Sequence, residues 1–202
     1  EGQDRGGGAH RAHVQGVVPG QRTLARLRLG EGDVEAADET VEGIRNSVDA
    51  DVYLMTNTTL LQVNAAQAVA TVDYLAGLSV PTVGFNALIY AGKGKDVDSG
   101  IPSEDLEPIL KAVRERTTTH GQRLIWYTPT QYCAFSPLQM ELGVKACTAA
   151  LYNMCVEPDG AVIPCQSYFV SLGNILTEPW EGIWEHELAR YLRDRDFMME
   201  KC

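Results

Sequence analysis

The distribution of cysteine constrains this chain more than any other feature of its sequence. All five cysteines lie after residue 132, at Cys133, Cys147, Cys155, Cys165 and Cys202. An odd number of thiols, gathered in one region of a chain without a recognisable export signal, is not typical of a disulfide framework. The pattern indicates thiolates that bind metal in a reducing cytoplasm.

A turn between Cys155 and Cys165 predicts how two of these thiols approach each other. Residues 158–160 read Pro-Asp-Gly, in which proline presets one dihedral angle and glycine supplies a positive φ. The short strands on either side should form a hairpin that brings the two sulfurs within about 7 Å of each other. Cys147 precedes the first strand and can fold over the same end. The sequence therefore predicts a compact site of three thiolates, with a fourth ligand from elsewhere. The expected strands cover residues 153–156 and 161–163.

An alternation of strands and helices occupies the preceding part of the chain. Continuous apolar runs predict strands that are buried on both faces, and apolar residues at helical spacing lie between them. Strand and helix in turn, with short connections, are typical of a parallel α/β unit, and right-handed crossovers make it a piece of a wound sheet or barrel. The expected strands are 51–55, 81–90 and 123–127. The expected helices are one that follows Asp38 as a possible N-cap and includes Val41, Ile44 and Val48, one over 64–76, and one that begins near residue 103.

Polar side chains follow two of the expected strands. Thr56, Asn57 and Thr58 come after the first, and Asn86 lies near the end of the second. Ligands of parallel α/β folds bind at the carboxyl ends of strands, so these four residues are candidates to bind a cofactor or substrate. The same side chains could equally cap the next helix or turn, and the sequence leaves both interpretations open.

Changes in composition and in the periodicity of apolar residues divide the chain into three parts. Residues 1–35 show no sustained period and are predicted to be an irregular N-terminal segment. Residues 36–130 carry the α/β alternation. Residues 131–202 are rich in cysteine, aromatic and turn residues, and end in one expected helix over 180–199.

The charge of the chain limits the partners that it can have. The formal net charge is −10, which disfavours binding to the phosphates of nucleic acid. No apolar stretch is long enough to span a bilayer, so no membrane partner is expected. We therefore expect a cytoplasmic protein.

The cysteine-rich part resembles the SPASM domain, the auxiliary-cluster module of many radical-SAM enzymes. Cys147, twelve residues, Gly160, four residues and Cys165 follow the opening motif of that domain, and the segment 156–165 (Val-Glu-Pro-Asp-Gly-Ala-Val-Ile-Pro-Cys) is similar to its hairpin. Leu-Gly-Asn-Ile at 172–175, followed by Trp180 and Trp184, is similar to a further segment of the family. The α/β part resembles the radical-SAM barrel more loosely.

This resemblance implies a fold and a set of cofactors. The fold would be α/β, the C-terminal portion of a partial (β/α) TIM-like barrel followed by a small SPASM-type domain with a β-hairpin and helix. Cys147, Cys155 and Cys165 would ligate a first auxiliary [4Fe–4S] cluster whose fourth ligand lies beyond residue 202, and Cys202 would serve a second cluster. Cys133 has no place in the motif, and is either a buried thiol or a residue that lines the active site.

The resemblance also implies an activity. The whole enzyme would cleave S-adenosyl-L-methionine to a 5′-deoxyadenosyl radical and modify a peptide or protein side chain, taking electrons from a donor such as ferredoxin or flavodoxin. Thr56, Asn57, Thr58 and Asn86 would face that cofactor or the substrate. The CxxxCxxC loop of the family is absent here, so the chain is expected to be a fragment that is inactive alone. The alternatives are a small-molecule or porphyrin-type substrate, or a non-catalytic zinc-binding structural module.

Overall fold

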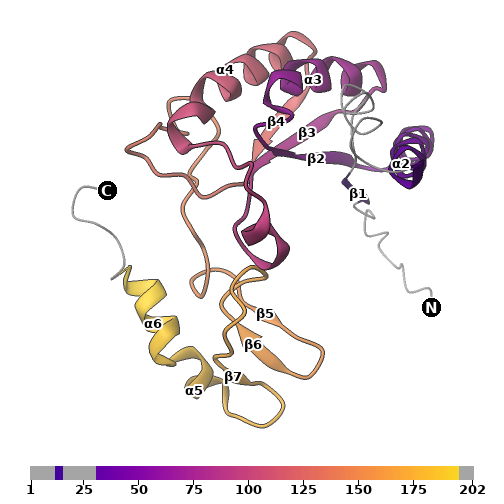
Figure 1. The fold of residues 1–202 in the computed structure, drawn as a ribbon. Helices are drawn as coiled ribbons and strands as arrows, with labels where there is room; N and C mark the ends of the chain where they lie inside the picture. Colours follow the sequence, from indigo (N-terminus) through magenta and orange to yellow (C-terminus); the bar gives the residue numbers. More distant parts are fainter. Residues whose placement is uncertain (1–11, 16–30, 196–202) are drawn as a thin grey trace, which may run out of the picture. The chain divides into compact units, whose positions relative to one another are not determined.

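A computed structural model describes residues 12–15 and 31–195, with side chains from residue 37 onward (Figure 1). The chain divides into two compact units. Each unit consists of segments from more than one part of the sequence, so no single boundary residue separates the two units. The first comprises residues up to Leu88, Ser99–Thr128 and Gln139–Gly143, and the second comprises Ile89–Asp98, Pro129–Leu138 and the residues from Val144 on.

The first unit is built on a four-stranded sheet in which every neighbouring pair is parallel. The strand order β1-β2-β3-β4 follows the chain. Thr56 pairs with Val83, and Val83 with Leu124, which confirms the predicted parallel α/β arrangement. The four described strands form an open sheet rather than a closed barrel. Their bounds are β1 Ala12–Gln15, β2 Leu54–Leu60, β3 Thr82–Ala87 and β4 Arg123–Trp126.

Helices connect successive strands of this sheet. Because each strand lies beside the one before it, right-handed crossovers all place their helices on the same face of the sheet. Figure 1 shows α3 and α4 side by side above β3 and β4. The connecting elements are α2 Glu31–Asp49, the short 3-10 helix η1 Ala65–Gln67, α3 Ala68–Gly77, and α4 Ser103–Thr119, with η2 Gly92–Asp96 placed in the second unit.

The two faces of the sheet differ in burial on β2, whereas every residue of β3 is buried. On β2 the side chains alternate strictly, with Leu54, Thr56, Thr58 and Leu60 buried and the residues between them only partly so. The buried set continues on the neighbouring strands at Val83, Phe85 and Trp126, and we call it the helix face. The apolar residues of the helices pack there: Val72 and Leu75 from α3, and Leu110 and Val113 from α4. The second face carries Met55, Asn57 and Thr59 from β2, Gly84 and Asn86 from β3, and Ile125 from β4.

The strand β2 begins and ends later than the sequence predicts, which corrects the position of three candidate residues. Thr56, Asn57 and Thr58 lie inside β2 and do not follow it. The end of α2 causes the delay, because Asp51 takes a left-handed conformation with φ 52°. The amides of Asp51 and Val52 bond to the carbonyls of Val48 and Ser47, the Schellman pattern of a helix end. The strand then continues through the threonines, which favour extended backbone.

The segment predicted to be irregular, residues 1–35, contributes regular structure at two places. Ala12–Gln15 forms β1 and pairs in parallel with β2, with Ala12 opposite Leu54. The helix α2 begins at Glu31, and Asp38, the expected N-cap, lies inside it. The pairing of β1 depends on a strand far along the chain, so local sequence gives little sign of it. The remainder of this segment lies outside the described residues.

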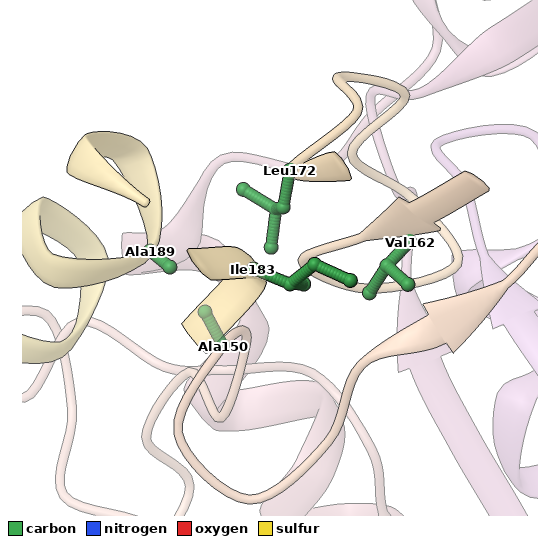
Figure 2. Packing of buried hydrophobic residues seen from close by; sticks show 5 residues of the cluster. All are labelled: Ala150, Val162, Leu172, Ile183 and Ala189. Atoms are coloured by element: carbon green, nitrogen blue, oxygen red, sulfur yellow. The ribbon is translucent and has the colours of Figure 1, made fainter. Parts of the chain in front are cut away.

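The second unit is a small antiparallel sheet with two short helices. Its core includes a cluster of five buried residues, Ala150, Val162, Leu172, Ile183 and Ala189, and Figure 2 shows Ile183 reaching toward Val162 beneath Leu172. The partly buried Met154, Leu188 and Leu192 pack around it. The elements are β5 Cys155–Val156, β6 Ala161–Ile163, β7 Gly173–Asn174, α5 Trp180–Trp184 and α6 Glu187–Asp194.

The single helix predicted over 180–199 is wrong, because the chain breaks at His186. The imidazole Nδ1 of His186 accepts a hydrogen bond from the amide of Leu188 at 3.2 Å and so caps the start of α6. Arg195, with φ 62°, ends the helix. Arg193 fastens the two helices together, since its guanidinium donates to the Trp184 carbonyl at 2.7 Å and lies 4.1 Å from the Trp184 ring centroid.

Among the described helices, none combines the length and the apolar composition needed to cross a bilayer.

Candidate functional site

The hairpin that carries the cysteines has the predicted turn. Gly160 takes φ 86°, and its amide donates to the Glu157 carbonyl at 2.9 Å. The Asp159 carboxylate accepts from the Ala161 amide at 3.0 Å, which closes the turn from the other side. The strands β5 and β6 pair antiparallel on either side of it. The prediction of a hairpin at this point is confirmed.

The register of the hairpin places Cys155 and Cys165 on the same side. Cys155 lies opposite Ile163, and Cys165 follows two residues later, so the two cysteines are diagonal neighbours. Both thiols face the same short loop. The Cys155 thiol donates to the Gln166 side-chain oxygen at 4.0 Å, and the amide of Ser167 donates to the Cys165 sulfur at 3.4 Å. Both cysteines are partly buried. The predicted distance between their sulfurs stays a prediction.

Cys147 lies on a segment that is fastened next to Cys165. The turn after it is anchored by the amide of Ala150, which donates to the carbonyls of both Asn153 and Pro164 at 3.0 Å. The thiol of Cys147 is itself exposed. Within residues 37–195 no three cysteine, histidine or acidic side chains are close enough to hold a metal ion. The main chain therefore gathers the segments that carry the three thiols, while the thiols themselves are not preassembled. Cys202 lies outside the described residues.

The chemistry of this donor set fits an iron–sulfur cluster. Thiolates are the usual ligands of such clusters, and hydrogen bonds to the sulfurs tune their potential. The described cysteines form no disulfide, and the Ser167 amide already donates to one of the sulfurs. A hairpin with partly buried thiols also limits access of water to the ligands.

The four candidate residues of the first unit do not share a face. Thr56 and Thr58 belong to the helix face, where their exposed fractions are 5% and 9%. Asn57 and Asn86 belong to the second face, since side chains of a strand alternate in direction. The prediction that all four face one ligand is therefore wrong for the two threonines. Covered by helices, they contribute to the core of the sheet.

The second face holds a polar group that the sequence interpretation found only in part. The Asn86 amide nitrogen donates to the Thr59 hydroxyl at 3.1 Å and to the Ala87 carbonyl at 2.8 Å. The Asn57 side-chain oxygen is buried without a hydrogen-bond partner among the described residues. An unpaired buried oxygen is costly, and a donor group of a ligand would satisfy it. Because residues two apart on a strand share a face, the position of Asn57 would have identified Thr59 as a further member of this polar group.

Tyr127, just after β4, covers part of this second face. Its hydroxyl donates to the Met55 sulfur at 2.7 Å. Burial of the ring raises the pKa of Tyr127, and the nearby Tyr53 hydroxyl adds to the rise, while the positive charge of Arg123 opposes it. The phenol is therefore a hydrogen-bond donor at neutral pH, and it lies across the strand on which Asn57 sits.

Gly84 is the position that allows Tyr127 to lie there. A β-carbon at Gly84 would meet the Tyr127 ring at 2.7 Å and the Thr56 carbonyl at 2.8 Å. Gly84→Ala is expected to displace the ring and the strand and to cost about 1–3 kcal/mol of unfolding free energy, measured by urea denaturation. Gly77→Ala is a suitable control, because a β-carbon there meets nothing within 4 Å. Equal stability of the two variants would contradict the packing described here.

Three comparisons with known proteins agree with this geometry. Residues 147–202 match the sequence profile of the SPASM family, an iron–sulfur cluster-binding domain. Over 182 residues the chain is 27% identical to the AdoMet-dependent heme synthase of Methanosarcina barkeri (strain Fusaro / DSM 804), a match that covers 83% of this chain and 52% of that protein.

Two solved structures share the fold at low sequence identity. They are native anSMEcpe with bound AdoMet and Cp18Cys peptide, with a TM-score of 0.54, and native anSMEcpe with bound AdoMet, with a TM-score of 0.53. Each is 20% identical and covers 85% of this chain and 48% of that one. The present chain thus spans about half the length of the proteins that it matches.

Proposed function

We propose that this chain, which resembles the radical-SAM enzymes that carry a SPASM domain, is the part of such an enzyme that joins the catalytic barrel to its auxiliary clusters. The observation that carries the proposal is the hairpin, on which two partly buried thiols face one loop and a third thiol lies on a segment anchored beside them. When bound, S-adenosyl-L-methionine supplies a 5′-deoxyadenosyl radical in this family.

The residues of the hairpin would hold the first auxiliary [4Fe–4S] cluster. Cys147, Cys155 and Cys165 supply thiolates, and the Ser167 amide stabilises the negative charge on the sulfur of Cys165. Partial burial of Cys155 and Cys165 keeps water away from their side of the cluster. Cys202 is proposed as a ligand of a second auxiliary cluster. We propose a cytoplasmic location, because the described cysteines form no disulfide and a reducing cytoplasm keeps thiols reduced. The proposed electron donor is a ferredoxin or flavodoxin.

For the substrate we propose a peptide or protein side chain. The second face of the sheet supports this choice, because Asn57 offers an unpaired oxygen acceptor, and the Tyr127 hydroxyl, which donates to Met55, has an oxygen that can also accept. Such acceptors pair well with the amide N–H groups of a peptide. A structure of the same fold binds a peptide together with AdoMet. A tetrapyrrole is the second candidate, favoured by the sequence similarity to a heme synthase.

The cluster content of the full-length enzyme tests the first part of the proposal. Anaerobically purified enzyme is expected to be brown, to absorb broadly near about 400 nm, and to contain iron and acid-labile sulfide in equal amounts. A structural zinc module would be colourless and would contain zinc alone. Zinc without iron or sulfide in the anaerobic preparation would refute the proposal.

The substrate class needs a separate measurement with the same reduced enzyme. Incubation with S-adenosyl-L-methionine and either a peptide encoded beside the gene or a porphyrin distinguishes the two candidates. We expect 5′-deoxyadenosine and a mass change in the peptide only. Turnover of the porphyrin alone would replace the peptide proposal by the tetrapyrrole one.

A further inference from the structure

We infer that Asn174 is a positioning residue of the cluster site. It holds the turn of the cysteine hairpin from outside, and so fixes the register that places Cys155 and Cys165 on the same side. This inference rests on the proposed function, since it concerns the cluster that these thiols would bind. It also gives a physical role to the segment Leu-Gly-Asn-Ile at 172–175, which stands out in the sequence only through its resemblance to the family.

The hairpin has few interactions of its own that could fix its register. Its strands β5 and β6 are only two and three residues long. Two strands of this length are marginally stable by themselves, and a slip of one residue would turn the side chains of the slipped strand to the opposite face. Such a slip would separate Cys155 from Cys165. Register in a hairpin follows from the conformation of the turn, so a group that holds the turn also holds the register.

Asn174 and the residue after it bind two carbonyls of this turn. The side-chain nitrogen of Asn174 donates to the Asp159 carbonyl at 2.9 Å, and the Ile175 amide donates to the Gly160 carbonyl at 3.0 Å. The hydrogen bonds inside the turn do not use either carbonyl. Gly160 lies directly against the Asn174 side chain, because a β-carbon at Gly160 would meet the Asn174 side-chain oxygen at 2.6 Å. The turn is therefore bonded to β7 as well as within itself.

The chain that leads into α5 holds Asn174 in place. The Asn174 amide donates to the Glu178 carboxylate at 2.8 Å, and the Asn174 carbonyl accepts from the amides of Thr177 and Glu178 at 3.1 and 2.8 Å. The side-chain oxygen of Asn174 accepts from the Leu176 amide at 2.9 Å, which directs the side-chain nitrogen toward Asp159. The side chain is thus preorganised, and it holds the turn without help from a metal.

The pairing of the three strands carries the effect of Asn174 to the thiols. Asn174 lies opposite Ala161 of β6, and the Leu172 amide donates to the Val162 carbonyl at 2.7 Å. The strand β6 pairs in turn with β5, where Cys155 lies opposite Ile163. Each pairing fixes the next, so a change at position 174 alters the arrangement of the cluster ligands through the hairpin.

The test uses full-length enzyme, anaerobically reconstituted with iron and sulfide. Asn174→Asp keeps the acceptor for the Leu176 amide but replaces the donor to Asp159 by a second oxygen, so that two acceptors face each other. We expect several-fold slower incorporation of the cluster, and an electron paramagnetic resonance spectrum of the reduced enzyme that differs from wild type. Asn46→Asp is the matched control, because it makes the same change at an exposed position of α2 in the first unit, and it should behave as wild type.

Ile183→Ala distinguishes positioning from stability. This change weakens the same unit through its core and leaves the groups of the turn in place. It should lower the unfolding midpoint, while the spectrum of the assembled cluster stays that of wild type. An Asn174→Asp enzyme with the wild-type rate and spectrum would overturn the inference, and so would the same altered spectrum in Ile183→Ala.

A measurement on the wild type gives an answer even where Asn174→Asp does not fold. In enzyme stripped of its clusters, the amides of Ile175 and Leu176 should stay protected from hydrogen exchange, followed by mass spectrometry. Exchange at the rate of an unfolded chain would refute a turn that is held before the metal binds. If Cys165→Ala loses iron while Asn174→Asp behaves as wild type, the hairpin site stands and only the role of Asn174 fails. If Cys165→Ala keeps its iron, the proposed cluster site itself fails.

Discussion

Replacing Cys165 with alanine in the full-length enzyme is expected to separate the two activities proposed for it, cleavage of S-adenosyl-L-methionine and formation of modified product. The variant loses a partly buried thiolate, together with the acceptor of the Ser167 amide. The auxiliary cluster should be lost or become labile, and the hairpin should loosen with it. S-adenosyl-L-methionine cleavage should persist, because the first unit has its own core around Phe85, Trp126 and Leu110. Formation of 5′-deoxyadenosine should therefore continue at a rate within about tenfold of wild type, while modified product falls below detection.

The measurement is separate quantitation of 5′-deoxyadenosine and of product, together with iron content. Gln166→Ala is a useful companion, since Gln166 only accepts a long hydrogen bond from the Cys155 thiol and should leave the iron content unchanged. Full product formation by the Cys165→Ala enzyme, with wild-type iron, would end the assignment of Cys165 as a ligand. Loss of both activities together would show that the cluster serves folding rather than turnover.

Replacing Ile183 with alanine should have the largest effect on the stability of the second unit. Ile183 is fully buried within a small cluster of five buried residues in this unit (Figure 2). Removing three carbon atoms from such a site should cost about 2–5 kcal/mol, from lost burial and from the cavity that remains. So small a core has few neighbours that can collapse into the space. We expect a lower unfolding midpoint for this unit and faster loss of its iron, followed by circular dichroism and chelator release.

Ile175→Ala makes the same chemical change at a position that is 44% exposed. Its unfolding free energy should stay within about 0.5 kcal/mol of wild type. If the two alanine variants unfolded together, Ile183 would not have the buried position described here. Iron loss in Ile183→Ala without any loss of stability would likewise contradict a coupling between this core and the cluster site.

Local sequence signals predicted those parts of the molecule that local interactions determine. Proline, aspartate and glycine at 158–160 specify a tight turn, so the hairpin was predictable without knowledge of its partners. The apolar runs at 81–90 and 123–127 likewise predicted β3 and β4, because buried parallel strands carry few polar residues. The assignment of the cysteines as metal ligands came from the resemblance to the family motif. The turn and strand signals alone would not have identified the metal.

Features that depend on a boundary or a distant partner were not predictable in this way. The face that each threonine of β2 occupies follows from where the strand begins, and the left-handed Asp51 moves that point by three residues from the expected Asp51 to Leu54. The break at His186 depends on a ring nitrogen that accepts from Leu188, although apolar residues continue at helical spacing through it. Cys133 is exposed, which corrects its interpretation as a buried thiol, and the turn that carries it lies next to Lys145, a neighbour that local sequence does not reveal.

The order of strands in the parallel sheet also bears on how the protein is made. Each strand pairs with the one synthesised immediately before it, so the sheet can grow in the direction of translation without waiting for a distant segment. The contacts of β2 with β3, and of β3 with β4, form across single helical crossovers, which keeps the entropy of each closure modest. Cys147, Cys155 and Cys165 all follow β4 in the chain, so the sheet can form before the hairpin that carries the thiols is complete.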